Sequence, residues 1–161
     1  MADLTIWVDA DSCPALVRNH AVKMGNKLDT KVVFAANKKI GSDAGVFEMA
    51  VCGIEKDAAD NYIFEHCKPG DLVITRDIVF AGRLVERGIC TINDRGTEFT
   101  PEMIKERLSI SDFDRQLAEI GLVKHVHEGY DKKKFAEFAN SFDRVIHRLL
   151  KQVVSTGSTT D

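Results

Sequence analysis

The sequence predicts a three-layer α/β/α sandwich built around a mostly parallel sheet of about five strands. Short, almost wholly apolar runs alternate along the chain with segments of helical periodicity, a pattern typical of crossovers in a parallel sheet. The apolar runs show little polar–apolar alternation, as expected of strands that are covered on both faces. The chain has 161 residues, 44% of them hydrophobic and 29% charged, which is the size and balance of one globular domain.

Five segments have the composition of strands. Four are short apolar or β-branched runs, and the fifth contains a single glutamate among apolar neighbours. In chain order they are Leu4–Val8, Lys31–Ala36, Val46–Cys52, Asp71–Thr75 and Ile89–Ile92. If these strands are parallel, their carboxyl ends lie along one edge of the sheet.

Helical segments lie between and after these strands, and capping residues mark several of their ends. A glycine, Gly25, predicts the end of the first helix, and Thr100 followed by Pro101 opens a short helix of about two turns. The predicted helices are Pro14–Met24, Asp57–Cys67, Ile78–Arg87, the two turns after Thr100, about Asp112–Ile120 before Gly121, and about Asp131–Val154.

The last helix carries a long apolar stripe, which predicts that one of its faces packs on the core. The stripe consists of Phe135, Phe138, Phe142, Val145, Ile146, Leu149 and Leu150. We therefore predict a single domain over residues 1–154. The polar segment 155–161 is predicted to be a disordered tail.

Composition excludes several classes of protein. No apolar run approaches the about 18 residues of a membrane span, so we expect no membrane association. The first residues lack the basic and apolar regions of a secretory signal, which favours a cytoplasmic location. The net charge of −3 does not indicate nucleic-acid binding by bulk charge, although residues 122–151 are mildly basic, with seven Lys or Arg against four Asp or Glu.

The cysteines and histidines give weaker signals. Four widely spaced cysteines predict buried thiols in a reducing compartment, with no disulfide framework and no zinc site. Among them, Cys13 lies near a helix start, where a thiol is sometimes activated, but we interpret it as inert. His125 and His127 have the spacing of metal ligands but lack further ligands nearby, so we interpret them as exposed loop residues.

Aspartates cluster at the predicted carboxyl ends of strands, where open parallel sheets bind their ligands. Asp9 directly follows the first apolar run, and Asp11 lies two residues later. Asp77 follows the fourth strand, while Asp57 and Asp60 share one face at the start of a helix. If the first and fourth strands are neighbours, these carboxylates meet at one edge of the sheet.

Carboxylates brought together in this way raise one another's pKa unless a cation compensates for their charge. Hard oxygen ligands favour Mg²⁺ or Mn²⁺. Such an ion activates a water molecule and neutralises charge on a leaving oxygen, and it requires no histidine or cysteine. The placement of the aspartates therefore indicates metal-dependent hydrolysis of a phosphate ester.

Each aspartate also has an ordinary structural explanation. Asp11, Asp57 and Asp77 are suitable N-caps for the helices that follow them. Asp60 is an acid that the helix dipole favours in a first turn. Asp9 is the hardest to explain in this way, because an acid that ends a buried strand needs a partner.

Basic side chains near the same edge are candidates for holding a phosphate. Arg76 lies directly after the fourth strand, and Arg95 lies just beyond the last one. A guanidinium at either place can bind a phosphate in a bidentate manner or pair with one of the acids. Lys132, Lys133 and Lys134 begin the last helix, where the alternative is an ordinary solvated helix start.

Four segments carry distinctive motifs. They are Ile6–Pro14 (IWVDADSCP), Lys56–Ile63 (KDAADNYI), Gly70–Ile78 (GDLVITRDI) and Asn93–Thr100 (NDRGTEFT). In these segments, and in register over nearly the whole chain, the sequence resembles the YaiI/YqxD family of uncharacterised bacterial proteins. The VDAD-x-CP and GDLVIT-x-D motifs are specific to that family.

This resemblance implies a PIN-like fold, because the family is grouped with PIN-like domains, which are metal-dependent nucleases acting mainly on RNA. In those nucleases an aspartate ends the first strand, an acid lies in a middle helix and another aspartate follows a strand of the Leu-x-Thr-x-Asp type. Asp9, Asp57 or Asp60, and Asp77 stand at the matching places in this sequence.

The sequence departs from the family pattern in three loops. Residues 39–45 stand where a Pro-Ser-Pro stretch is usual, Asp94 stands where a proline precedes Arg-Gly, and residues 127–130 replace a Gly-Gly-Pro loop. These differences concern loops that would contact a substrate more than they concern the acids. Asp94 also lies past a strand end and is a further candidate carboxylate.

We predict from these residues a Mg²⁺- or Mn²⁺-dependent phosphodiesterase, a hydrolase with RNA as its substrate. Asp9, Asp60 and Asp77 are predicted to be the catalytic residues and direct metal ligands. Asp11 and Asp57 are predicted to bind the metal through water or to support the direct ligands.

Two other functions are consistent with the sequence. Asp9 and Asp11 resemble the Asp-x-Asp loop of haloacid-dehalogenase-type phosphatases, in which the first aspartate attacks phosphorus and the second is a general acid. That class requires a further acid beside Asp77. The other alternative is a non-catalytic binding or regulatory module whose acids pair with Arg76 and Arg95, which the net negative charge favours.

Overall fold

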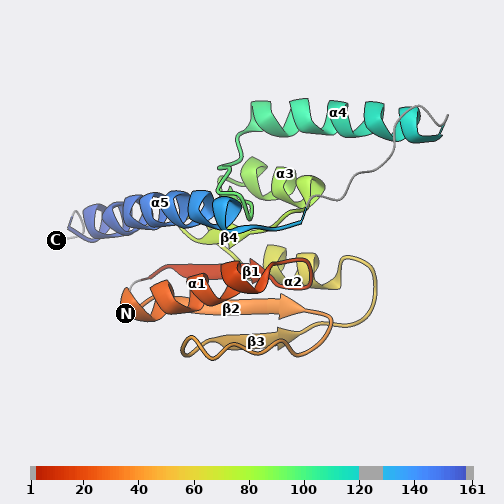
Figure 1. Cartoon of the computed structure of the whole chain (residues 1–161). Helices are drawn as coiled ribbons and strands as arrows, with labels where there is room; N and C mark the ends of the chain where they lie inside the picture. Colours follow the sequence, from red (N-terminus) through yellow and green to blue (C-terminus); the bar gives the residue numbers. More distant parts are fainter. Residues whose placement is uncertain (1–2, 120–128, 159–161) are drawn as a thin grey trace.

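Five parallel strands form the central sheet of the molecule (Figure 1). The computed structural model describes residues 3–119 and 129–158. All five predicted strands are present, with the third and fourth shorter than expected. They are β1 Thr5–Asp9, β2 Lys31–Ala36, β3 Glu48–Val51, β4 Leu72–Ile74 and β5 Cys90–Ile92.

The strand order is β3-β2-β1-β4-β5. The chain runs outward from β1 to β2 and β3, and then returns to place β4 on the other side of β1. Strands β1 and β4 are therefore hydrogen-bonded neighbours, with Ile6 opposite Leu72 and Val8 opposite Ile74. This reversal of direction makes the carboxyl ends of β1 and β4 the switch point of the sheet, the place at which open α/β sheets bind ligands.

Helices cover both faces of the sheet and produce the predicted three layers (Figure 1). α1 and α5 pack on one face, α2 and α3 pack on the other, and α4 packs against α3. Their bounds are α1 Ala15–Lys27, α2 Ala58–His66, α3 Ile78–Glu86, α4 Pro101–Glu119 and α5 Lys132–Ser158.

Each strand contributes side chains to two cores, which explains the continuous apolar runs. On β1, Ile6 and Val8 lie in the core under α1 and α5, together with the fully buried Phe138 and Phe142 of α5. Trp7 points to the opposite face and packs in the core under α2 and α3. The stripe predicted for the last helix is thus confirmed as a core face.

Three helix boundaries differ from the sequence-based predictions. α1 continues past Gly25 to Lys27, because this glycine serves close packing: a Cβ on it would lie 2.3 Å from Cγ2 of Val32 on β2. α4 is one helix of 19 residues, so the predicted break before Asp112 is wrong, and the expected stop at Gly121 lies outside the described residues. α5 includes residues 155–158 of the segment expected to be disordered, whereas residues 159–161 lie outside the described range.

A buried carboxylate secures the opposite, amino edge of the sheet. Asp71 accepts hydrogen bonds from Thr5 N (2.9 Å), from Trp7 Nε1 (3.0 Å) and from both the main-chain N and Nζ of Lys68 (3.1 and 2.8 Å). These contacts join β1 to the start of β4. An acid at this edge therefore has a structural role that its partners explain fully.

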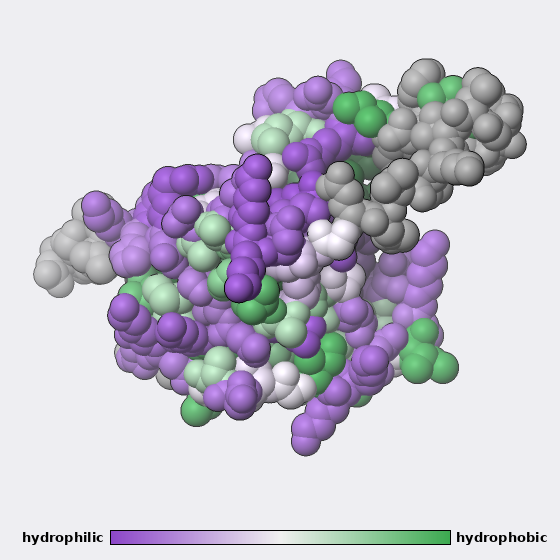
Figure 2. All heavy atoms as spheres, viewed as in Figure 1, coloured by the Kyte–Doolittle hydropathy of each residue, from purple (hydrophilic) through white to green (hydrophobic). Residues whose placement is uncertain are grey.

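The surface is largely polar. On the face shown in Figure 2, apolar atoms form small separate patches within a mostly hydrophilic surface. In the described parts of the chain, none of the helices combines the length and the apolar character needed to cross a membrane.

Candidate carboxylate site

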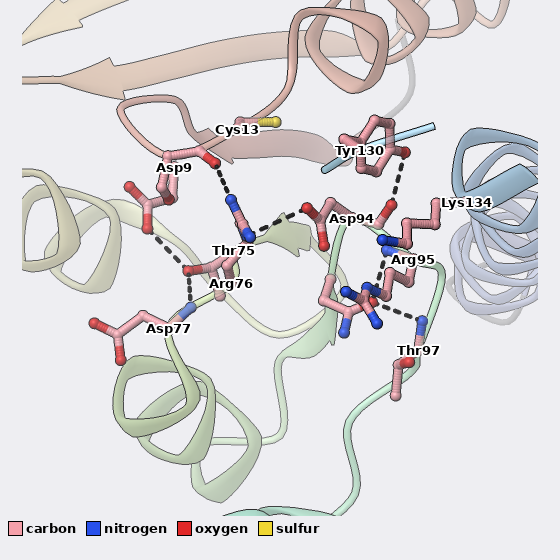
Figure 3. A network of polar contacts seen from close by, with 12 residues as sticks. Asp9, Cys13, Thr75, Arg76, Asp77, Asp94, Arg95, Thr97, Tyr130 and Lys134 are labelled. Atoms are coloured by element: carbon pink, nitrogen blue, oxygen red, sulfur yellow. Dashed lines mark hydrogen bonds and ion pairs between the residues drawn. The ribbon is translucent and has the colours of Figure 1, made fainter. Parts of the chain in front are cut away.

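Asp9 is the last residue of β1 and lies where the carboxyl ends of β1 and β4 meet. Its side chain is buried, and Oδ2 accepts a hydrogen bond of 2.9 Å from Oγ1 of Thr75, the residue after β4. The same Thr75 hydroxyl oxygen accepts a hydrogen bond of 3.1 Å from Asp77 N (Figure 3). Thr75 thereby fixes the end of β1 relative to the turn that leads into α3.

Asp77 occupies the N-cap of α3. Its Oδ1 accepts a hydrogen bond of 3.1 Å from Phe80 N, so the capping role considered for it from the sequence is present. A carboxylate has a second oxygen and further lone pairs. Capping and metal ligation are therefore compatible at this residue.

α2 brings two more carboxylates to the same place. Asp57, Asp60 and Asp77 each contribute one carboxylate oxygen to a group of three, and no two of these oxygens are more than 4.8 Å apart. Asp57 precedes α2 in the left-handed backbone conformation (φ 63°) and makes no side-chain capping hydrogen bond. Asp57 thus occupies the N-cap position that the sequence suggested without capping an amide through its side chain, and Asp60 lies in the first turn of the helix as expected.

Asp9 completes a cluster of four carboxylates, because its carboxyl group is hydrogen-bonded to that of Asp60. We call Asp9, Asp57, Asp60 and Asp77 the carboxylate cluster. Its members come from β1, α2 and the β4–α3 turn. The meeting of these acids at the edge between the first and fourth strands is as the sequence predicted.

The electrostatics of the carboxylate cluster favour uptake of a positive charge. Burial, followed by repulsion from Asp9, Asp77 and Asp57, raises the pKa of Asp60 to about 7. Burial also raises the pKa of Asp9, although the hydrogen bond from Thr75 opposes this shift. Among the described residues, no lysine or arginine forms an ion pair with any of the four acids.

Asp11 does not cap α1, which was the structural explanation considered for it from the sequence. Both of its carboxylate oxygens accept hydrogen bonds from Asn37 N, at 2.9 and 3.1 Å. The N-cap position of α1 is Pro14, and no side chain caps this helix. Asp11 therefore ties the β1–α1 loop to the end of β2, and its charge contributes to the raised pKa of Asp9.

Asp94, the further candidate carboxylate, does not join the cluster. It is buried, and its Oδ2 lies 3.2 Å from Arg76 Nε (Figure 3). Nη1 of Arg76 also donates to the carbonyl oxygen of Ser12 at 3.2 Å. Arg76 thus links the loops that follow β1, β4 and β5, and one of the predicted acid–arginine pairs exists, but with Asp94 and not with the carboxylate cluster.

The other basic candidates lie around the loop after β5 and the start of α5. Arg95 is exposed, and its main-chain N donates to Asn93 Oδ1 at 2.9 Å. Lys132 and Lys133 are exposed at the start of α5, and Nζ of Lys134 donates to Gly129 O at 2.7 Å. Figure 3 shows Lys134 beside Arg95 and near the Arg76–Asp94 pair.

The minor sequence signals do not change this assignment. Burial raises the pKa of the Cys13 thiol to about 12, which agrees with an inert thiol. His125 and His127 lie outside the described residues. Two contributors were missed by sequence reasoning, namely the Thr75 hydroxyl and the Asn37 amide. For Thr75 a signal existed, since this residue lies two positions before Asp77 in the GDLVIT-x-D motif.

Comparison with known proteins identifies the family. The model of the family described as "Uncharacterized BCR, YaiI/YqxD family" matches residues 7–148. The chain belongs to the YaiI/YqxD family. The matched segment contains every residue of the carboxylate cluster, from Asp9 to Asp77, and the described part of the sheet from Trp7 onward. The resemblance noted in the four sequence motifs is thereby confirmed.

Relatives in this family carry the name UPF0178 protein. One from Treponema denticola is 42% identical over 149 residues, which cover 92% of this chain and 96% of the relative. Relatives from Myxococcus xanthus and Pseudomonas fluorescens are 36% and 35% identical, with 97% and 99% of their own lengths covered. No solved structure matches this YaiI/YqxD chain.

Proposed function

We propose that this protein is a Mg²⁺- or Mn²⁺-dependent phosphodiesterase that cleaves RNA in the cytoplasm. The observation that supports this most is the carboxylate cluster itself. Four acids from three elements meet at the carboxyl ends of β1 and β4, and none of them forms an ion pair with a described lysine or arginine. Such a donor set of hard oxygen ligands suits these two cations.

The residues divide into ligands and groups that position them. Asp60 and Asp77 would hold the cation together with Asp9 or Asp57, whose carboxyl groups lie beside them. Thr75 fixes one oxygen of Asp9, and the first turn of α3 fixes one oxygen of Asp77, so the remaining lone pairs are oriented in advance. When bound, the cation would supply a water of lowered pKa and neutralise charge on a leaving oxygen.

RNA is proposed as the substrate on two grounds. The resemblance to PIN-like nucleases implies it, because Asp9, Asp60 and Asp77 match the places of their acids. Basic side chains are also available for contacts to a phosphate backbone. Arg76 directly precedes Asp77 of the cluster, Arg95 and Lys134 lie near the Arg76–Asp94 pair (Figure 3), and Lys132 and Lys133 are exposed at the start of α5.

The phosphatase alternative is disfavoured by the contacts of Asp11. In an Asp-x-Asp phosphatase the second aspartate must deliver a proton to the leaving group. Here both oxygens of Asp11 accept from Asn37 N, and the group links two loops. The binding-module alternative predicts instead that the acids bind no divalent ion tightly, which can be measured.

The proposal is tested by incubating labelled single-stranded RNA with the protein and Mn²⁺ or Mg²⁺. Wild type is compared with Asp9→Asn and Asp77→Asn, and with Glu65→Gln as a control. Asparagine is itself a good N-cap and can accept the bond from Thr75, so the two variants keep the local structure. Glu65 is an exposed acid on α2 and provides the same loss of charge away from the cluster.

We expect RNA cleavage by wild type and Glu65→Gln, and its loss in both aspartate variants. Calorimetric titration with Mn²⁺ should show the same division, with uptake lost in the aspartate variants. Cleavage that persists in Asp9→Asn and Asp77→Asn would refute the assignment. Turnover of p-nitrophenyl phosphate without RNA cleavage would favour the phosphatase, and absence of both activities and of metal uptake would favour a binding module.

A further inference from the structure

A recess of about 360 Å³ opens beside the carboxylate cluster. It lies between the β4–α3 turn, the loop after β5, α4 and α5. We call it the arginine recess, because guanidinium groups from three separate elements line it. Its lining includes Arg76, Arg95, Arg107, Asn93, Asp94 and Glu137.

The charge of the arginine recess is opposite to that of the carboxylate cluster. Three arginines and two acids, Asp94 and Glu137, line it, which leaves one net positive charge. Asp94 is already engaged with Arg76 Nε at 3.2 Å. The guanidinium of Arg107, on α4, lies over the ring of Phe99 at 5.7 Å from its centroid. An anion is therefore the ligand that this lining favours.

The floor of the recess is rigid. Asn93 Oδ1 accepts hydrogen bonds from Arg95 N and from Thr97 N, both at 2.9 Å. Gly96 has a φ of +83° and lies against α5, where Ser141 Oγ donates to its carbonyl oxygen at 2.5 Å. The loop that carries Arg95 is thus held in place by its own amides and by α5, so a ligand would not have to order it.

The arginine recess adjoins the carboxylate cluster at the β4–α3 turn. Arg76 lines the recess and Asp77, the next residue, belongs to the cluster. A phosphate held at the cluster is repelled by four acids unless a cation is bound, so the acids alone give a substrate little affinity. A neighbouring subsite for a second phosphate would supply affinity that does not depend on the metal. The volume of the arginine recess, about 360 Å³, lies at the lower end of the range of ligand-binding clefts and is larger than a single phosphate ion occupies.

We propose that the arginine recess binds the phosphodiester backbone of a single-stranded RNA one or more nucleotides away from the phosphate at the carboxylate cluster. The proposal rests on the proposed function for the identity of the strand. It adds Arg107 of α4 to the substrate contacts. It also requires a substrate that spans both places, so a polymer should bind far better than a single phosphate.

The test measures binding of fluorescein-labelled single-stranded RNA in EDTA, so that cleavage does not interfere. Wild type is compared with Arg107→Gln and Arg107→Lys. The control is Arg87→Gln, which also removes one positive charge. Arg87 lies at the C-terminal end of α3, whereas the recess lies at its N-terminal end, and the Arg87 guanidinium lies 4.5 Å from the centroid of the Phe64 ring. Thermal unfolding of each variant verifies that it is folded.

We expect Arg107→Gln to weaken RNA binding by about tenfold, as for the loss of one charge-assisted contact. The slope of log affinity against log salt should become shallower by about 0.7, the value for one phosphate contact on a single strand. Arg107→Lys should retain the wild-type slope because it retains the charge. Arg87→Gln should bind as wild type does.

Equal affinities of Arg107→Gln and Arg87→Gln would overturn the proposal. So would competition by inorganic phosphate or a mononucleotide that is as effective as competition by unlabelled RNA, because a single phosphate would then be the ligand. The nuclease proposal is judged separately, by cleavage and by Mn²⁺ titration. Binding that depends on Arg107 without any cleavage would refute the nuclease while supporting the recess as a strand-binding subsite.

Discussion

Replacing Asp60 by asparagine should stabilise the metal-free protein at about pH 8. In the folded state burial and then the charges of Asp9, Asp77 and Asp57 raise the pKa of Asp60 from 3.8 to about 7. The folded protein therefore binds a proton that the unfolded chain releases near pH 4, and stability falls as the pH rises from there through about 7. The asparagine amide can donate to Asp9 as the protonated acid does, but it never ionises.

The size of the effect follows from the pKa. A change from 3.8 to about 7 corresponds to about 4 kcal/mol of unfolding free energy. Solvent reaches the carboxylate cluster beside the exposed Asp57, and its screening reduces the expected value to about 2 kcal/mol. Wild type should lose this amount relative to Asp60→Asn as the pH rises from about 4 to about 8, which spans the unfolded and folded pKa values of Asp60.

Urea unfolding in EDTA at several pH values measures this difference. Glu65→Gln, on the same helix, serves as the control for removal of a negative charge and should follow wild type. Added Mn²⁺ should restore the stability of wild type at about pH 8, because a ligand of the folded state stabilises it by mass action, and should have little effect on Asp60→Asn. An Asp60→Asn variant that is less stable than wild type in EDTA at about pH 8 would show that the charge of Asp60 does not destabilise the metal-free fold.

Three further substitutions test the framework that holds the site. Asp71→Asn should lower the unfolding free energy by about 3 kcal/mol, because a buried network that includes Trp7 loses its charged acceptor. Urea unfolding followed by tryptophan fluorescence measures this loss, and a change below about 1 kcal/mol would contradict the structural role of Asp71. Gly96→Ala should cost about 2 kcal/mol in the same assay, because φ is +83° and a Cβ would lie 2.7 Å from Glu137 O, so an unchanged midpoint would show that this loop yields. Phe142→Ala should cost about 4 kcal/mol by leaving a cavity under α5, and a thermal midpoint close to that of wild type would contradict its place in the core.

Sequence patterns located the acids because they report where strands end. An aspartate that directly follows an apolar run, as Asp9 does, or lies within a few residues of its end, as Asp77 does, is placed at the carboxyl end of a strand whatever the order of the strands. Whether these two strand ends meet depends on the return of the chain to place β4 beside β1, which local patterns do not determine. The sheet order satisfies this condition.

Contacts between distant loops were beyond the reach of local patterns. The partner of Asp11 is the amide of Asn37, which lies 26 residues away, and neither the helix cap nor the metal-supporting role that the sequence suggests for Asp11 indicates this contact. Gly25 was interpreted as a helix end for a similar reason, since glycine serves both as a stop signal and as a residue that lets a helix approach a strand. In each case a local preference was overridden by tertiary packing.

The two edges of the sheet treat buried acids in opposite ways, and this contrast supports a cation at the carboxylate cluster. At the amino edge, Asp71 is surrounded by donors, including Trp7 Nε1 and Nζ of Lys68, so its charge is compensated within the chain. At the carboxyl edge, Asp60 has another carboxyl group, that of Asp9, as its hydrogen-bond partner. The hydrogen bonds from Thr75 Oγ1 to Asp9 and from Phe80 N to Asp77 need only neutral acceptors. Four acids in their place repel one another and so reduce the stability of the metal-free fold. A ligand of high positive charge removes that cost, and the pH dependence of Asp60→Asn against wild type measures it directly.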